Sequence, residues 1–282
     1  MIHFKKIILM SALSLAVSSV SFAEETSLIN KDSNWYKMSF MAETGFVTVL
    51  SHTIQFGNTG SVFDYKEEGN QDILFPYQRF SAEFRVFDRH LFVFLYQPLE
   101  VITTAKAARN LAFYTTAFPT GTVLDIKYGF SFYRASYVWY FIQEPKSEFG
   151  MGLSMQVRNA SIQFKAADGT DITIQENVGP VPIIKMTGKM ALDNGVWGAI
   201  DADGFYASSA IFNGSGFPFV GAIWDVSARV GVELKNSISP YLNIRCLGGG
   251  AKGTSRSEDT QGDGYTENWL NTLSVTLGVE FK

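Results

Sequence analysis

The sequence predicts an all-β fold, a transmembrane antiparallel up-and-down β-barrel of about ten strands. Three observations predict this fold: apolar and polar residues alternate along long segments, short and long connections alternate between them, and the composition is 46% hydrophobic and 15% aromatic but only 18% charged. Such a composition suits a surface that does not face water. The formal net charge of −4 excludes a strongly basic nucleic-acid binder, so no nucleic-acid partner is expected.

The N-terminal segment, residues 1–23, has the pattern of a secretory signal. Lys5 and Lys6 precede an apolar stretch diluted by serines, and small residues around Ala23 form an A-x-A-like exit. We expect cleavage after Ala23, which leaves 24–282 as a single barrel domain. The alternative is a retained anchoring helix, but the apolar stretch is shorter than the ~20 residues that a spanning helix needs.

Period-2 alternation defines the expected strands. It is clearest from Ala222 to Leu234 and from Leu273 to Phe281, where every second residue is apolar. These stripes are longer than the usual soluble strand and match the ~10-residue tilted strand of a membrane barrel. The ten expected strands cover 36–56, 76–88, 91–104, 122–142, 148–165, 180–192, 196–208, 220–235, 240–252 and 268–282.

The connections between these segments are expected to alternate in length. Asn194 and Gly195 form the dipeptide best able to adopt a type I′ hairpin. Outer-membrane barrels have short periplasmic turns and long outer loops, and both termini are periplasmic when the strand number is even. Ten strands with connections of alternating length satisfy both conditions. The short connections are 88–90, 143–147, 193–195 and 236–239, and the long ones are 57–75, 105–121, 166–179, 209–219 and 253–267.

A secreted β-sandwich or lipocalin-like barrel is the soluble alternative, because it also alternates apolar and polar residues. It would bury the apolar stripe and expose charges such as Asp225 and Arg229 to water. Aromatic residues near strand ends favour the membrane barrel, since they suit an interfacial girdle. These residues are Trp35, Tyr36, Tyr137, Trp139, Tyr140 and Phe141.

With the signal and the apolar stripe from Leu273 to Phe281, the chain resembles the small outer-membrane β-barrels of Gram-negative bacteria over its whole mature length. The resemblance implies location in the cell outer membrane, contact with its lipid, and recognition of the C-terminal strand by the barrel-assembly machinery. In that family the aromatic residue is usually the last one, whereas here Lys282 follows Phe281. The resemblance implies no particular activity.

If the apolar stripes face lipid, the opposite positions point into the lumen. A ten-stranded lumen is only slightly wider than one that side chains fill, so we expect a paired polar core, with a narrow ion path as the alternative. The Asn194 turn sets a register with Lys185 opposite Asp203 and Lys189 diagonal to Asp201. The predicted lumen residues are Glu43, Glu83, Arg85, Arg134, Arg158, Lys185, Lys189, Asp201, Asp203, Asp225, Arg229, Glu233 and Arg245.

The fourth expected strand breaks this pattern. Leu124 and Phe130 have the parity of Arg134, while Tyr133 and Trp139 have the other. A charge on the lipid face at mid-depth costs about 2–4 kcal/mol. A one-residue bulge near Ser131 is therefore expected to turn Arg134 into the lumen.

Candidate chemistry is sparse. His52 beside Ser51 could serve as a general base in a rim-located, lipid-processing hydrolase, but by parity His52 shares the face of Leu50 and Ile54, so no dyad forms. The acidic loop Glu258–Glu267 lacks the spacing of a calcium loop, and the lone Cys246 excludes an intramolecular disulfide. We expect that the protein is not an enzyme and that it binds no metal and no cofactor. The expected role is structural or interactive, with surface binding through the loops as a further alternative.

Overall fold

The computed structural model describes residues 35–211, 218–234, 237–254 and 262–282, and these residues are nearly all β-strand. Ten antiparallel wall positions close into a barrel because the last strand pairs with the first. The wall strands are β1 (Tyr36–Phe56), β3 (Leu74–Val86), β4 (His90–Gln97), β5 (Glu100–Lys106), β8 (Val123–Gln143), β9 (Ser147–Ala166), β10 (Ile172–Ala191), β11 (Val196–Ser208), β12 (Phe219–Val232), β13 (Ile238–Thr254) and β14 (Tyr265–Phe281). β4 and β5 share one wall position, since both pair with β8.

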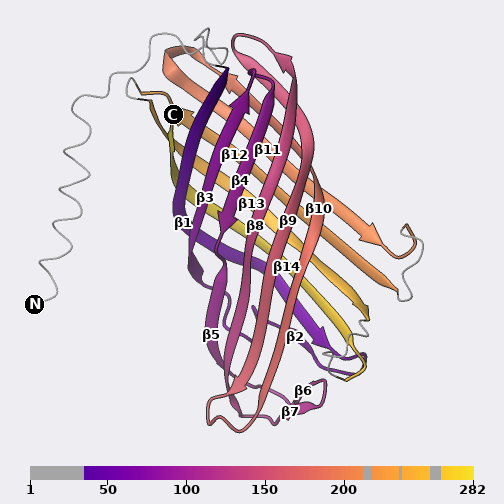
Figure 1. Cartoon of the computed structure of the whole chain (residues 1–282). Helices are drawn as coiled ribbons and strands as arrows, with labels where there is room; N and C mark the ends of the chain where they lie inside the picture. Colours follow the sequence, from indigo (N-terminus) through magenta and orange to yellow (C-terminus); the bar gives the residue numbers. More distant parts are fainter. Residues whose placement is uncertain (1–34, 212–217, 235–236, 255–261) are drawn as a thin grey trace, which may run out of the picture.

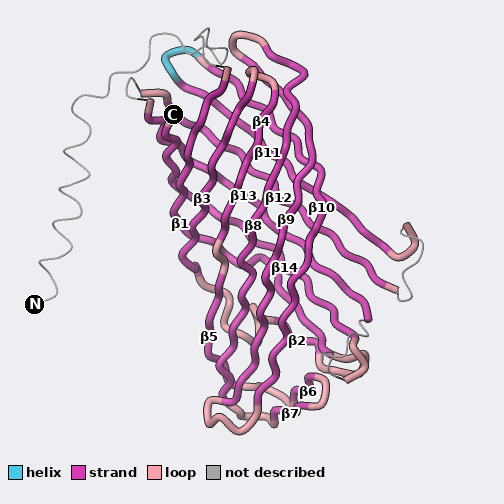
Figure 2. The backbone as a smooth tube through the Cα atoms, viewed as in Figure 1, coloured by secondary structure: helices cyan, strands magenta, loops and turns pink. Residues whose placement is uncertain are grey.

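Three short strands lie in the connections, β2 (Val62–Asp64), β6 (Leu111–Phe113) and β7 (Thr116–Phe118). A 3-10 turn, η1 (Asp193–Gly195), lies at the predicted Asn194 hairpin, where Asn194 has a φ of 60°. Figure 2 shows this turn at the end of the barrel that holds the short connections. Within the described residues, no helix is long and apolar enough to cross a membrane.

Both described chain ends lie beside the short turns, and the longer connections gather at the opposite end, called here the long-loop end (Figure 1). One predicted connection is wrong. β10 begins at Ile172, so the expected long loop at 166–179 shrinks to the turn between Ala166 and Ile172. The residues from Ile172 to Gly179, predicted as loop, belong to β10 and lengthen the β9–β10 hairpin.

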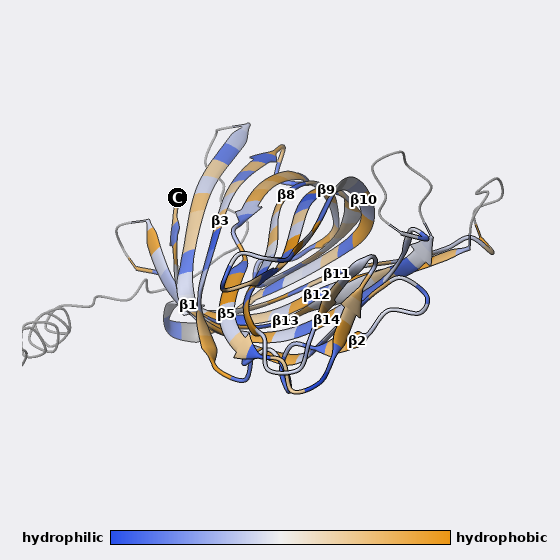
Figure 3. Ribbon diagram, turned by 90° about the horizontal axis from the view of Figure 1, so that it is seen from below, coloured by the Kyte–Doolittle hydropathy of each residue, from blue (hydrophilic) through white to orange (hydrophobic). Residues whose placement is uncertain are grey.

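In the part of the wall nearer the short turns, the apolar residues of the strands face outward. On β14, Val275 and Leu277 are exposed, while Ser274 and Thr276, which alternate with them, are buried. Figure 3, seen from the long-loop end, shows hydrophobic and hydrophilic residues alternating along the strands. A soluble sandwich would bury the apolar stripe, so this arrangement is that of a membrane barrel.

The polarity of both faces inverts along β8. Arg134 and Ser136 are buried inside, and towards the long-loop end Leu124 and Ile126 are buried on the same face. The predicted bulge near Ser131 is wrong, because the pairing of β8 with β9 is unbroken from Leu124 to Tyr140. No bulge is needed, since the apolar residues of this strand end face the interior.

A bulge is present instead in β1, at Leu50. The β1–β14 register shifts between Val49 and Ser51. Leu50 consequently faces outward with Phe46, while His52 is buried inside with Ile54. The predicted shared face of His52 and Leu50 is therefore wrong.

The aromatic residues near the short turns are mostly exposed, as a girdle requires. Trp35, Tyr36, Tyr137, Trp139 and Phe141 lie on the outer surface. Tyr140 is the exception, because it is buried in the lumen with the Arg85 guanidinium 4.3 Å from its ring centroid.

Candidate functional site

The lumen beside the short turns is filled by a network of charged side chains, called here the ionic layer. At its centre, Asp225 on β12 is fully buried and pairs with arginines from three other strands. Its carboxylate lies 2.5 Å from Arg245, 3.0 Å from Arg134 and 3.4 Å from Arg79. Arg245 is on the neighbouring strand β13, whereas the contacts of Arg134 on β8 and Arg79 on β3 cross the barrel. A buried carboxylate with several charge-assisted hydrogen bonds is stabilised, whereas an unpaired one is very costly.

The network continues along β10 and β11. Lys185 lies opposite Asp203 in the register and its Nζ is 3.0 Å from that carboxylate, which confirms the register predicted from the Asn194 turn. Asp203 also lies 3.0 Å from Arg134. Asp201 binds Arg229 at 2.6 Å. The chain of ion pairs is therefore continuous from one wall of the lumen to another.

Lys189 is diagonal to Asp201 in the β10–β11 register, because Thr187 is the direct partner of Asp201. Its ammonium nevertheless pairs with Glu280 on β14, at 3.7 Å. Lys189 also lies over the Trp197 ring, 4.5 Å from its centroid. A cation over an indole face is attracted by the ring quadrupole, so Lys189 bridges β10 to the closing strand.

Glu43 occupies the β1 side of the layer. Its carboxylate accepts hydrogen bonds from Asn243 Nδ2 at 2.8 Å and Thr276 Oγ1 at 2.9 Å, and Arg245 lies 3.9 Å away. Because Thr276 is on β14, this carboxylate joins the first strand to the last. The contact lies across the seam at which the barrel closes.

Three of the predicted lumen residues differ from the rest. Glu83 faces the lumen and lines a small void within the ionic layer. Glu233 lies past the end of β12 at the rim, where Ser239 Oγ donates to it and Lys282 pairs with it. Arg158 points inward but lies towards the long-loop end, away from the network, and among the described residues no carboxylate pairs with it.

Sequence reasoning missed several members of the ionic layer. Arg79 has the parity of Glu83 and Arg85, and Glu148 has the parity of Arg158, so the period-2 signal for both was present. Glu148 binds Arg85 through two bonds of 2.7 and 2.9 Å. Neutral side chains were missed because the alternation of polar and apolar residues shows which face a side chain occupies but not which partner it meets. Those that accept hydrogen bonds from the arginines are Gln97 and Gln156.

The layer has equal numbers of cationic and anionic side chains, and the void described among them is small. Its cations are Arg79, Arg85, Arg134, Lys185, Lys189, Arg229 and Arg245, and its anions are Glu43, Glu83, Glu148, Asp201, Asp203, Asp225 and Glu280. A void of about 40 Å³ lies among these side chains. Since one water needs roughly 10–15 Å³ on this measure, the void has room for about three waters.

The long-loop end of the interior has the opposite character, an aromatic core formed by β1, β8, β9 and the loops that carry β2, β6 and β7. His52 is fully buried there, stacked on Tyr65 at 3.8 Å between ring centroids. Its Nδ1 is 2.8 Å from Gln71 Oε1. Ser51 points away to the outer face and accepts a hydrogen bond from Asn271, so the two neighbours form no dyad.

The acidic loop contributes a brace between loops. Glu258 and Asp259 lie outside the described residues. Asp263 accepts the backbone N–H groups of Asn58 at 2.8 Å and Tyr265 at 3.0 Å, and these bonds hold the pKa of that carboxyl below its usual range. Across the described ranges, no group of three His, Cys, Asp or Glu side chains could hold a metal ion.

No family model and no curated protein matches the sequence. The fold is similar to solved Gram-negative outer-membrane β-barrels. The outer membrane protease OmpT from Escherichia coli is 10% identical with a TM-score of 0.46, over 89% of this chain and 99% of that one. The Pseudomonas putida toluene transporter TodX is 8% identical with a TM-score of 0.33, over 87% and 90%. The β domain of the Bordetella autotransporter BrkA is 11% identical with a TM-score of 0.32, over 87% and 99%.

Proposed function

We propose that this chain is a sealed outer-membrane barrel with a structural or binding role, and neither a diffusion pore nor an enzyme. The observation that carries the proposal is the fully buried Asp225, held by three arginines from three strands. Together with the small void of about 40 Å³ that these three arginines help to line, this cross-bracing leaves the lumen too full for a hydrated solute.

A non-enzymatic role is supported by the state of His52. A general base must reach the proton that it removes, and His52 is enclosed by Tyr65, Tyr128 and Gln71. In the part of the chain that the structure describes, no hydroxyl or thiol is hydrogen-bonded to His52. The rim-located hydrolase therefore lacks a nucleophile at this position.

Single-channel recording in planar bilayers tests the proposal. We expect the full-length mature chain to insert without steady conductance, while an open porin recorded in parallel conducts. Variant Lys165→Met, changed on the outer face of β9, should be equally silent. Steady conductance of the unmodified chain above the bilayer background would contradict the sealed lumen and favour the narrow pore.

We further propose that lipid and the barrel-assembly machinery are the partners of the outer surface, the latter through β14. Phe281 is exposed on that strand and Lys282 is tied to Glu233. Phe281→Ser should slow membrane assembly in cells, whereas Lys282→Met should not. Equal assembly of Phe281→Ser and the unmodified chain would remove the support for this partner.

A further inference from the structure

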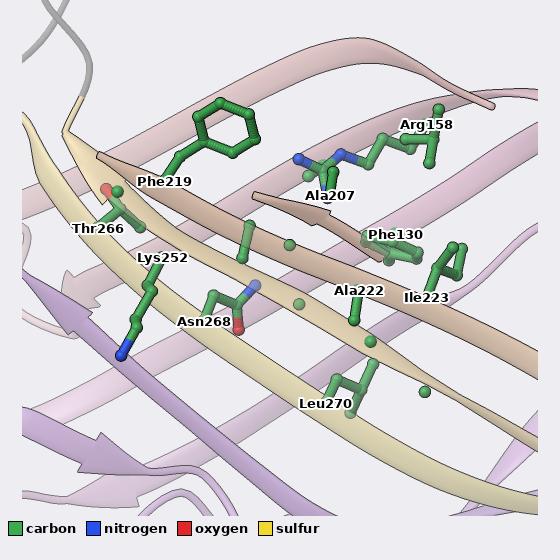
Figure 4. Close-up of a pocket in the computed structure, with 18 of the residues that line it drawn as sticks. Phe130, Arg158, Ala207, Phe219, Ala222, Ile223, Lys252, Thr266, Asn268 and Leu270 are labelled. Atoms are coloured by element: carbon green, nitrogen blue, oxygen red, sulfur yellow. The ribbon is translucent and has the colours of Figure 1, made fainter. Parts of the chain in front are cut away.

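A cavity of about 420 Å³ lies on the long-loop side of the ionic layer, lined mostly by apolar side chains (Figure 4). Leu247, Leu270 and Ile162 are among those that form its wall. The cavity exists because small inward positions on β12 and β13, such as Gly221 and Ala251, leave the lumen unfilled at this level. Its volume is within the range of small-molecule sites.

Two charged side chains line the cavity, Arg158 and Lys252. Lys252 is exposed, whereas Arg158 is only partly exposed and projects into the apolar space. Arg158 on β9 points inward, and Figure 4 shows it among the lining residues. Its Nε is buried without a hydrogen-bond partner, and no carboxylate among the described residues pairs with it. The arginines at the centre of the ionic layer, by contrast, each meet an anion. A guanidinium in apolar surroundings without an anion is unfavourable, so the cavity is complementary to a negatively charged group.

The wall beside the cavity is interrupted. The β10–β11 ladder ends at Ile184 and Gly204, although β10 continues back to Ile172 and β11 runs on to Ser208. The two strands diverge beyond that point in Figure 1. Val181 on β10 and Ala207 on β11 line the cavity from the two sides of this seam.

Two prolines keep the seam from closing. Pro180 and Pro182 lie opposite Val157 and Met155 of β9 in the register. The other edge of β10 at these two residues faces β11. Because alternate residues of a strand direct their N–H groups to the same edge, both prolines remove donors from that edge. An interruption elsewhere in the wall is bridged, since Asn70 Nδ2 donates to Thr104 O at 2.8 Å beside β5.

The seam lies where the outer surface changes character. Met155 and Val157 on β9 are exposed and apolar, and the next outward residues are Asn159 and Ser161. Arg158 pairs in register with Gly179, beside the prolines. Its guanidinium is therefore at the depth of lipid head groups, and the seam connects the cavity with the lipid beside it.

We infer that the cavity binds an amphipathic monoanion, a fatty carboxylate taken from the adjoining membrane leaflet through the β10–β11 seam. The carboxylate binds the forked guanidinium of Arg158, and the alkyl chain fills the apolar cavity. A single unpaired arginine matches one negative charge. This site is separate from the sealed ionic layer, so it does not depend on whether the lumen conducts.

Binding of radiolabelled dodecanoate to the full chain in lipid nanodiscs tests the inference, with empty nanodiscs subtracted. We expect saturable binding of one molecule per chain, and dodecanol to compete at least about tenfold more weakly, because it lacks the charge that a guanidinium binds. Arg158→Met should weaken binding about tenfold or more, and Arg158→Lys by less. Lys165→Met, on the same strand but facing outward, should bind like the unmodified chain.

The inference is overturned if binding does not saturate, if dodecanol competes as well as dodecanoate, or if Arg158→Met binds normally. Should Arg158→Met fail to fold, judged by heat-dependent gel mobility, the two competitors decide the question on the unmodified chain. The entry route has its own test. Pro180→Thr with Pro182→Thr restores two donors to the seam and should slow dodecanoate association at little changed affinity, whereas unchanged association would remove the seam as the entry.

Discussion

The barrel interior near the short turns consists of charged side chains, whereas the interior near the long loops consists of aromatic and aliphatic ones. Asp225 with its three arginines represents the first region. Phe113 and Phe164, both fully buried with ring centroids 4.5 Å apart, represent the second. The same long strands, β8 and β9, contribute to both regions.

The difference follows from what surrounds each region. Around the ionic layer the outward residues of β8 are apolar, such as Tyr133 and Trp139, while around the aromatic core they are Asp125 and Lys127. Burial of apolar side chains stabilises an interior only where the outside is water. Where lipid surrounds the wall, paired charges hold the strands together instead.

The largest effect is expected from Asp225→Asn, which leaves three buried arginines short of a carboxylate. Removing one partner of a buried ion pair costs about 3–5 kcal/mol, and here the free energy of unfolding of the whole barrel should fall by about that amount. Urea unfolding followed by tryptophan fluorescence in detergent micelles measures it. A loss below about 1 kcal/mol would mean that the ionic layer is not a structural core.

A smaller and local loss is expected from Phe113→Ala in the aromatic core. Truncating a buried phenylalanine costs about 3–5 kcal/mol, and the low end applies because Phe113 is carried by a loop that can settle. Limited proteolysis should cut the loop between β5 and β8 faster, while the gel mobility of the barrel stays unchanged. If the barrel itself unfolded together with this loop, the two regions would not be separate.

Arg85→Lys should weaken the end of the ionic layer beside the short turns. Lysine keeps the charge but loses the two-pronged bond to Glu148 and the contact with the Tyr140 ring. We expect a loss of about 1.5 kcal/mol in the free energy of unfolding. An equal loss from Lys37→Met, whose partner is the exposed Asp88, would deny the special role of the buried pair.

The smallest effect is expected from acidification at the long-loop end. The backbone donors of Asn58 and Tyr265 hold the pKa of Asp263 below its usual 3.8. A depressed carboxyl pKa stabilises the fold above the unfolded value, so this brace is fully present above about pH 4 and is lost as the pH falls through the lowered pKa. The protection of the Asn58 amide, the intrinsic exchange rate relative to its observed rate at the same pH, should therefore fall only at more acidic pH, and Asp263→Ala should remove this pH dependence.

Much of the fold could be predicted from the sequence, because period-2 alternation reports directly on a two-sided wall. The Lys185–Asp203 pairing followed from one turn, since Asn194 fixes the register of its hairpin. The face of His52 could not be predicted, because the bulge at Leu50 has no polarity signal. The wrong bulge near Ser131 came from assuming that every apolar stripe faces lipid.

The candidate site was only partly predictable, and for a physical reason. Parity places Arg79 and Glu148 in the lumen, but which arginine meets Asp225 depends on contacts across the barrel between strands far apart in the chain. The isolation of Arg158 is likewise invisible in the sequence. It depends on small residues on β12 and β13 and on where β10 and β11 separate.

Spin-label accessibility along β8 tests the central claim most directly, that lipid surrounds a sealed ionic layer and water surrounds an aromatic core. Single cysteines at 125, 127, 133, 134, 136 and 139, in a Cys246→Ser background, would carry the label in nanodiscs. We predict that oxygen reaches labels at 133 and 139, that a water-soluble nickel chelate reaches 125 and 127, and that neither reaches 134 or 136. Nickel access at 134 and 136 would show an open lumen, and oxygen access at 125 and 127 equal to that at 139 would contradict the inversion of polarity.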